Sequence, residues 1–416
     1  MDLDRWMHAP VTRRGFLRGA GKGGVGISLA ALLQACGQDE PPTSSLTPTA
    51  GSSETPTIVP LPPIAGELKV AQWPLYIDRA KEGARPTLEA FEAETGIGID
   101  YRETINDNQA WFAKVYPQLS IGQSTGWDLM CNADWLVHQF WQLGFIEPLH
   151  WEALPTADRN MLNAFRDPSY DPGNAHSVPW QGGVTGIAYY PDLAGDITGM
   201  ADLWNPDLEG KVGMLTEMVD TMTLTLLMLG IDPQKATIDD ARRAQEKLLE
   251  QRDANIVRQY YGQEYVQELV NKNVYASLAW SGDAFYWKYI GGAPDLEFIV
   301  PEEGGVLWAS ASMIPIEAAH PADAHAFMDF YFRPEIAVQV TDWVLYMTPV
   351  EGVQDLMREK ASVAKGADRE YYETLAESPL LFPPEDPSTA NLYEYKAFSG
   401  EEFEQWAEIF NAVIHA

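Results

Sequence analysis

The sequence predicts a two-lobed α/β protein with a ligand cleft between the lobes. From residue 67 onward, strand-like and helix-like segments alternate, which is typical of a mostly parallel sheet covered by helices on both faces. The alternation stops after residue 145 in a long stretch with four prolines and then resumes. A chain of 416 residues is also too long for one compact core, so we expect two lobes. Pockets favour such domain interfaces.

The first alternating region begins with a strand and a well-marked helix. Residues 67–73 alternate apolar and polar side chains like a strand, and residues 86–94 carry apolar side chains at helical spacing. Pro86 near the start and Gly96 past the end are typical helix boundaries. The further expected elements of this region are a strand at 98–101, a helix at 111–119, a strand at 127–131 and a helix at 135–143.

The second alternating region follows a segment that joins the lobes. Residues 177–190 are small or apolar and suit a strand that crosses between the lobes. No internal repeat is present, which excludes a solenoid. The expected elements after the crossing are a strand at 212–215, helices at 221–229 and 239–250, a strand at 274–278, a helix at 284–290, a strand at 305–314, and helices at 322–331 and 401–413.

The first 36 residues predict export and lipid anchoring. The run TRRGFLR at residues 12–18 fits the twin-arginine export pattern. The apolar stretch behind it is Gly-rich and too short to span a bilayer, and it ends in LQAC, which resembles the lipobox of bacterial lipoproteins. A chance arginine pair and cysteine is the alternative. The order of charge, apolar run and cysteine favours lipidation of Cys36.

A tether is predicted at residues 37–66, which are rich in Thr, Pro and Ser and nearly free of aromatic residues. No later segment reaches 18 apolar residues. We therefore expect an extracytoplasmic protein, in the periplasm or at the outer face of the cytoplasmic membrane, held there through lipid. The second cysteine, Cys131, lies in an apolar run and is expected to be buried rather than reactive.

Composition excludes several classes of protein. A hydrophobic fraction of 46% with 14 Trp is enough for a packed interior, so the bulk of the chain is not disordered. The formal charge of -32 would be repelled by phosphate backbones, which argues against nucleic-acid binding. The same charge attracts cations.

Catalytic signatures are missing from the sequence. It contains no G-x-S-x-G elbow, no P-loop, no H-E-x-x-H and no C-x-x-C, and its seven His show no metal-ligand spacing. We therefore expect no enzyme, no cofactor and no metal. A secreted glycoside hydrolase stays an alternative, because a pair of carboxylates would suffice for it. A structural or adhesive lipoprotein with a dead site is a third possibility.

A series of short motifs runs along residues 67–415. The motifs are FExxTGI at 91–97 with YRE at 101–103, WDL at 127–129, VPW at 178–180 with TGIAY at 185–189, ADLW at 201–204, AWSG at 279–282, PEEGG at 301–305, MIP at 313–315 and YxTP at 346–349. Each motif alone is weak, but their order covers essentially the whole body. In this order they resemble the extracellular solute-binding proteins of ABC importers, and more closely their spermidine/putrescine-binding branch.

The resemblance implies a type II two-lobed fold with a hinge and delivery of a solute to an ABC permease in the membrane. We place lobe 1 at residues 67–184 and 309–352 and lobe 2 at 185–308 and 353–416, and we expect a monomer. A polyamine is a chain of methylenes between ammonium groups, so its site needs aromatic walls and carboxylates. A different small solute, a zwitterion or a sugar, is the alternative ligand.

The site residues are carried over position by position. The aromatic wall implied by the resemblance is Trp73, Tyr76, Trp135, Trp280, Trp308 and Tyr346, for each of which ordinary core packing is the alternative. Glu217 and Asp220 match two family carboxylates, although Asp220 could equally be the N-cap of the helix at 221–229.

The chain departs from the family pattern at three further positions. Leu75 and Ser310 replace two further acids of the family, and Ala133 replaces a serine. Two of four expected ammonium partners are thus missing. Asp134 and Asp283 lie beside aromatic positions and are our hypothetical substitutes. The site would then prefer a shorter diamine or a ligand with one cationic end.

Overall fold

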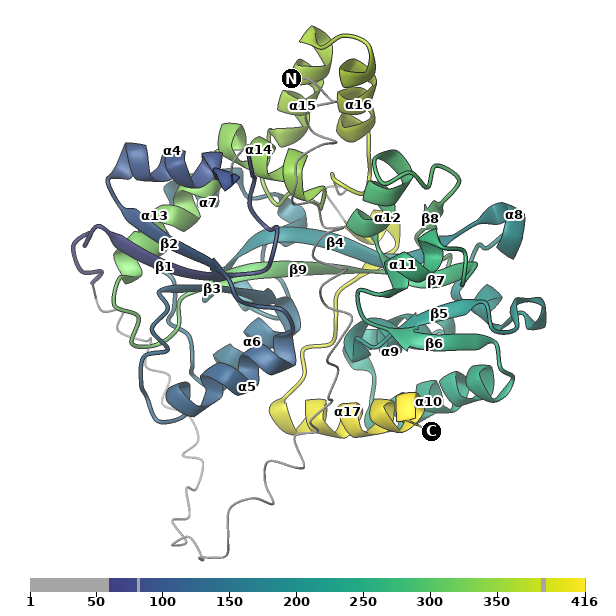
Figure 1. Cartoon of the computed structure of the whole chain (residues 1–416). Coiled ribbons are helices and arrows are strands. Elements are labelled where there is room, and N and C mark those ends of the chain that lie inside the picture. Colours follow the sequence, from purple (N-terminus) through teal and green to yellow (C-terminus); the bar gives the residue numbers. More distant parts are fainter. Residues whose placement is uncertain (1–59, 81–82, 383–386, 416) are drawn as a thin grey trace, which may run out of the picture. The chain divides into compact units, whose positions relative to one another are not determined.

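The computed structural model describes residues 60–80, 83–382 and 387–415 (Figure 1). Residues 61–416 form one compact unit. The predicted twin-arginine segment, Cys36 and most of the tether lie outside the described residues. At the end of the tether, the buried carboxylate of Asp323 accepts hydrogen bonds from the backbone N–H groups of Ala65 and Gly66, at 2.9 and 2.7 Å.

One mixed sheet runs through the described part of the chain, with the strand order β2-β1-β3-β9-β4-β7-β5-β6, β10 beside β9 and β8 beside β4. Its strands are β1 (Glu67–Gln72), β2 (Gly98–Glu103), β3 (Leu129–Ala133), β4 (Ser177–Tyr189), β5 (Val212–Leu215), β6 (Val257–Tyr261), β7 (Ala276–Trp280), β8 (Glu297–Ile299), β9 (Gly305–Met313) and β10 (Leu392–Tyr393).

The sheet has two parallel halves joined by two long strands. Strands β1, β2 and β3 are parallel to one another, as are β5, β6 and β7. Between them β4 and β9 run antiparallel, β9 pairing with β3 and β4 pairing with β7. Figure 1 shows these two strands passing from one half to the other. The predicted α/β class and the predicted crossing strand are therefore confirmed.

Helices cover both faces of each half. In Figure 1, α4 and α13 lie on one side of β1–β3 and α5 and α6 on the other, whereas α9, α10 and α17 lie beneath β5–β7. The helices are α4 (Pro86–Thr95), α5 (Asn108–Leu119), α6 (Asp134–Gln142), α7 (Pro155–Asn160), α8 (Pro191–Ala194), α9 (Met218–Met228), α10 (Ile238–Asp253), α11 (Tyr265–Val270), α12 (Ser281–Tyr289), α13 (Pro321–Tyr331), α14 (Pro334–Val344), α15 (Val353–Val363), α16 (Ala367–Ala376) and α17 (Gly400–His415).

Helix boundaries follow local chemistry. Helix α4 has Pro86 in its first turn and ends at Gly96, whose φ of 72° is the left-handed conformation that glycine adopts without strain. Helix α5 is capped by Asp107, whose side chain accepts the backbone N–H of Ala110 at 2.7 Å. Helix α10 begins with a capping box between Thr237 and Asp240.

The interior contains two large hydrophobic clusters. One gathers residues of β1, β2, α4, α13 and α14, and the other gathers residues of α5, α6, β5, β7, α9 and α17. Trp180 on β4 belongs to the first, where it stacks on Tyr331 with ring centroids 4.0 Å apart and donates its indole N–H to the carbonyl of Tyr76. Cys131 is buried, and burial raises the pKa of its thiol to about 12. The prediction of an unreactive Cys131 agrees with this.

The packing of one segment differs from the expected lobe assignment. Residues 353–416 were expected in lobe 2, but α15 packs against α14 and α16, and their buried side chains belong to the cluster around β1 and α13. The later part of the segment lies with the second half, where Tyr395 donates to Asp220 of α9 and α17 packs on α10. The physical reason is connectivity, because α14 and α15 are joined by a short link that keeps them together.

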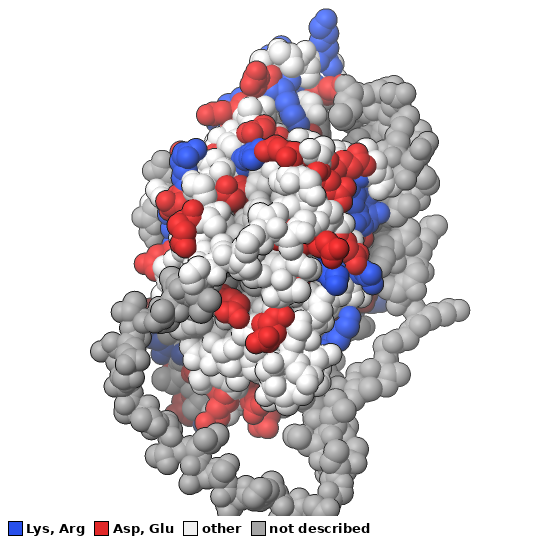
Figure 2. Space-filling view, turned by 90° about the vertical axis from the view of Figure 1, so that its left-hand side faces the viewer, with Lys and Arg blue, Asp and Glu red and all other residues white. Residues whose placement is uncertain are grey.

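No helix among the described residues is both long and apolar enough to cross a membrane. Figure 2 shows acidic side chains scattered over the face of the first half of the sheet, with basic side chains between them rather than gathered in a single patch. This face therefore offers no concentrated positive surface for a phosphate backbone.

Candidate functional site

The predicted site residues lie where the two halves of the sheet meet. Trp73 follows β1, Asp134 follows β3, Glu217 lies two residues after β5, and Trp280 ends β7. Strands β1 and β3 of the first half and β5 and β7 of the second thus deliver these residues from their carboxyl ends, where ligands of α/β sheets bind. Trp73, Trp280 and Trp308 each pack against both hydrophobic clusters, which places them at the junction.

Asp220 is a buried carboxylate held by side chains from three separate elements. It lies in the first turn of α9, which begins at Met218, so the N-cap alternative for Asp220 is wrong: the N-cap is Glu217. Its Oδ1 accepts the hydroxyls of Thr185 on β4 and Tyr395, and its Oδ2 accepts the indole N–H of Trp280 at 3.2 Å. Burial raises its pKa, and these three hydrogen bonds partly offset that rise.

The carboxylate of Glu217 accepts no hydrogen bond from the described residues. Although it occupies the N-cap of α9, its side chain makes no capping hydrogen bond, and within the described ranges it has no hydrogen-bond or ion-pair partner. Burial is the largest cause that raises its pKa from 4.5 to about 8, and the charges of Asp220, Asp107 and Asp134 add to it. The carboxylate therefore lacks a cation.

Asp134 attaches the start of helix α6 to strand β9. Its Oδ1 accepts the backbone N–H of Trp135 at 2.8 Å and its Oδ2 accepts that of Ala309 at 3.0 Å. Burial raises its pKa well above the usual range, and the negative charges of Glu394 and Asp220 raise it further. Asp134 is thus near the other acids, with each oxygen already accepting one backbone hydrogen bond.

Asp283 is linked to Trp280 through Tyr265. Its carboxylate accepts the hydroxyl of Tyr265 at 2.9 Å, and that hydroxyl in turn accepts the backbone N–H of Trp280 at 3.1 Å. The rings of Tyr265 and Trp280 meet edge to face at 5.6 Å. In the structure Asp283 therefore fixes the position of Trp280.

Three aromatic residues of the predicted wall contact one another. Tyr346 meets the ring of Trp308 at 5.4 Å and that of Tyr76 at 6.2 Å, both edge to face. The hydroxyl of Tyr76 lies 3.4 Å from Oγ of Ser310. The structure thus brings these four predicted residues together in one group.

Two glycines make room for these rings. A Cβ at Gly183 would lie 2.4 Å from the ring of Trp308, and a Cβ at Gly282 would lie 2.5 Å from the ring of Tyr346. Neither glycine has a left-handed backbone conformation, so close approach of the aromatic ring is what requires glycine there.

Gly282→Ala is expected to lower the free energy of unfolding by about 1–3 kcal/mol, because the added methyl overlaps the Tyr346 ring. Denaturant unfolding measures this change. Gly400→Ala is the matched control, since nothing lies within 4 Å of a Cβ at Gly400. Equal stabilities of the two variants would contradict the close packing at Gly282.

The structure adds three residues that sequence reasoning missed. Thr185 and Tyr395 donate hydrogen bonds to Asp220, and Phe403 stacks on Trp135 with ring centroids 5.0 Å apart and an angle of 11° between the planes. Thr185 stood in a quoted motif, TGIAY, but was not assigned a role. Tyr395 and Phe403 lie in the C-terminal part of the chain, where no local pattern marks a site.

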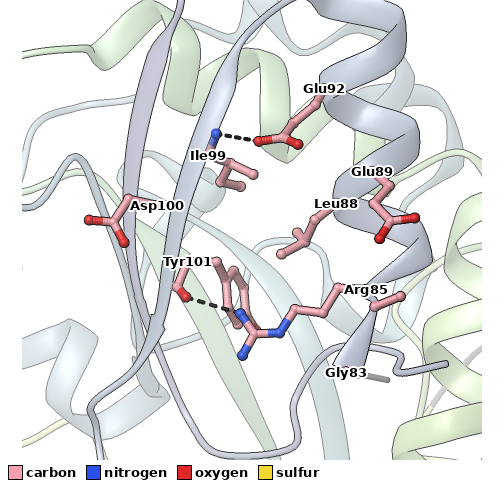
Figure 3. A pocket seen from close by; sticks show the side chains of 9 residues that line it. Gly83, Arg85, Leu88, Glu89, Glu92, Ile99, Asp100 and Tyr101 are labelled. Atoms are coloured by element: carbon pink, nitrogen blue, oxygen red, sulfur yellow. Dashed lines mark hydrogen bonds between the residues drawn. The ribbon is translucent and has the colours of Figure 1, made fainter. Parts of the chain in front are cut away.

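A cavity in the structure lies away from these residues. It has a volume of about 330 Å³ and lies between α4 and the edge strand β2 (Figure 3). Arg85 crosses it, donating to the carbonyl of Tyr101 at 3.0 Å, and Glu92 accepts the backbone N–H of Ile99 at 2.9 Å. None of the predicted ligand-binding residues lines this cavity.

Comparison with known proteins assigns the family. A family model described as bacterial extracellular solute-binding protein matches residues 87–369. Spermidine/putrescine-binding periplasmic protein 1 of Haemophilus influenzae is 25% identical over 364 residues, covering 86% of this chain and 89% of that protein. The putrescine-binding periplasmic protein PotF of Escherichia coli is 24% identical over 340 residues, covering 77% of this chain and 84% of that protein.

A solved structure gives the same fold. A spermidine/putrescine ABC transporter protein from Listeria monocytogenes superposes with a TM-score of 0.68 at 23% identity, covering 84% of this chain and 99% of that one. The two parallel halves joined by β4 and β9 are therefore the two lobes of a type II binding protein, as predicted. The family matched over residues 87–369 consists of binding proteins rather than enzymes, which agrees with the prediction. The chain belongs to the family of bacterial extracellular solute-binding proteins.

Proposed function

We propose that this protein is the solute-binding component of an ABC importer, and that it binds a polyamine, putrescine or spermidine, between its lobes and delivers it to a membrane permease. The observation that carries the proposal is the set of Glu217, Asp220 and Asp134. The charges of Asp220 and Asp134 raise the pKa of Glu217, and the charge of Asp220 raises that of Asp134. None of the three is paired with a Lys or Arg among the described residues. A bound ammonium would supply the missing charge.

The surrounding side chains suit the rest of such a ligand. Trp280 lies against Asp220, and the group of Trp308, Tyr346 and Tyr76 offers aromatic surface for methylenes. A cation over an aromatic face contributes about 0.5–2 kcal/mol. The relatives named for putrescine and spermidine binding support this ligand class.

The remaining sequence predictions complete the proposal. Twin-arginine export and lipid on Cys36 would hold the protein in the extracytoplasmic space against the membrane that contains its permease. The protein would act as a monomer. Closure about the hinge formed by the crossing strands would require contacts from both lobes, with Trp73, Tyr76 and Trp135 from the first and Glu217, Asp220 and Trp280 from the second.

The ligand class is tested by thermal unfolding of the full chain. Putrescine, spermidine, spermine, amino acids and sugars are each added in a separate experiment. A polyamine present at 100 times its dissociation constant should stabilise the folded state by about 2.7 kcal/mol. Stabilisation by polyamines alone is the expected result. Stabilisation only by sugars or zwitterions would contradict the polyamine proposal and would indicate that Leu75 and Ser310 changed the ligand.

A further inference from the structure

The C-terminal segment contributes a side chain to the site that the family resemblance did not supply. After β10 the chain passes Tyr395 and enters α17, which carries Phe403 in its first turn. Helix α17 is attached to the second lobe, where Gln245 and Arg252 of α10 donate to its carbonyls of Ile409 and Val413. Figure 1 shows this segment (yellow) running down between the two groups of strands to α17.

Phe403 covers one face of a predicted ligand-binding ring. Its ring is nearly parallel to that of Trp135, at 11° and 5.0 Å between centroids. Trp135 lies in the first turn of α6 in the first lobe, so this stack joins the two lobes. The face of Trp135 that Phe403 covers is not available to a ligand's methylenes or ammonium.

The carboxylates near this stack have limited capacity for further ammonium groups. Asp134, next to Trp135 in the chain, accepts a backbone N–H on each oxygen, and Asp220 accepts three side-chain donors. Asp283 accepts the hydroxyl of Tyr265. Among the described acids that were predicted to bind ammonium, Glu217 alone has a carboxylate that accepts no hydrogen bond.

From these two observations, and resting on the proposed function, we infer that Phe403 is a specificity-determining residue that restricts the site to a short diamine. Spermidine has an additional aminopropyl arm and a third ammonium compared with putrescine. The arm needs aromatic surface and the ammonium needs a carboxylate, and the Trp135 end of the site withholds both. Putrescine can place one ammonium at Glu217 and the other at the acceptor site that Asp220 retains beside its three donors, so it is the ligand that fits.

The test compares the affinities of the full-length protein and its variants for putrescine and spermidine by calorimetry. The wild type should bind putrescine more tightly. Phe403→Ala should expose the Trp135 face and shift the ratio of the two affinities about tenfold toward spermidine. Phe403→Tyr keeps the stack and should retain the wild-type ratio. Phe112→Ala is the matched control, because Phe112 is also a half-buried ring but packs on Tyr116 and Phe140 of the first lobe.

The outcomes separate the two proposals. Polyamine binding by the wild type with an unchanged affinity ratio in Phe403→Ala would overturn the role of Phe403 and leave the proposed function standing. A ratio that shifts equally in Phe112→Ala would also overturn it, because the effect would then be a general loosening. Failure of every variant to bind either amine, with all of them folded by thermal unfolding, would overturn both.

Discussion

Asp220→Asn is expected to weaken putrescine binding at least about 100-fold, because an ammonium that leaves water without a charged partner costs several kcal/mol. Asp220 is 1% exposed, and its position is fixed by Thr185, Tyr395 and Trp280. The asparagine keeps the size of the side chain and one oxygen acceptor, whereas its NH2 group replaces the other acceptor, so the substitution removes the charge and at least one of these hydrogen bonds. Calorimetric titration measures the effect.

A matched control separates the local charge from the net charge of the protein. Asp239→Asn also removes one carboxylate, but the Asp239 side chain is 82% exposed in the first turn of α10 and pairs with Arg242 rather than with any residue of the site. It should leave the affinity unchanged. Unfolding curves of both variants establish that they are folded. An Asp220→Asn protein that binds putrescine as tightly as the Asp239→Asn control would remove Asp220 from the site.

Polyamine affinity is expected to rise with pH up to about 8, by as much as about tenfold per unit. In the free protein Glu217 has a pKa of about 8, so it is mostly protonated at neutral pH. A bound ammonium favours the ionised carboxylate, so binding must release this proton. Calorimetry at pH 7 in buffers of different ionisation enthalpy measures the release directly, and Glu217→Gln should abolish it along with the pH dependence.

The same group predicts the pH dependence of stability without ligand. The pKa of Glu217 in the folded protein lies above its usual value of 4.5, so the folded state binds more protons than the unfolded state between these two values. The free energy of unfolding should therefore fall as pH rises from about 5 to about 8, and Glu217→Gln should flatten this fall. A wild-type free energy of unfolding that does not change between pH 5 and pH 8 would contradict the raised pKa of Glu217.

Local sequence signals located most of the regular elements. Helix α4 was found from Pro86, Gly96 and the spacing between them, and β4 was found from its continuous run of small and apolar residues. Strand β6 was missed because it is a partly exposed strand at the edge of the sheet without clear alternation. Helix α14 was missed although Ile336 and Val340 do follow helical spacing.

The start of α9 shows why a local signal can mislead. Asp220 before Thr221 reads as an N-cap, since Asp commonly accepts helix N–H groups there. In the structure the helix begins at Met218, three residues earlier than predicted, and the Asp220 carboxylate instead binds side chains of β4, of the end of β7 and of the C-terminal segment. These partners are distant in sequence, and no local pattern reveals them.

The sequence by itself determined the α/β class, the two alternating regions and the family, because hydrophobic periodicity, turn residues and ordered motifs are local properties of the chain. Only the tertiary structure decided which of the acids are available. Asp134 and Asp283 are held by Ala309 and Tyr265, while Glu217 is left with other acids as its neighbours. The tertiary structure also places the ring of Phe403 on that of Trp135. Such contacts depend on how separate elements pack, and hydrogen bonding and burial then set the charge and exposed surface of each side chain.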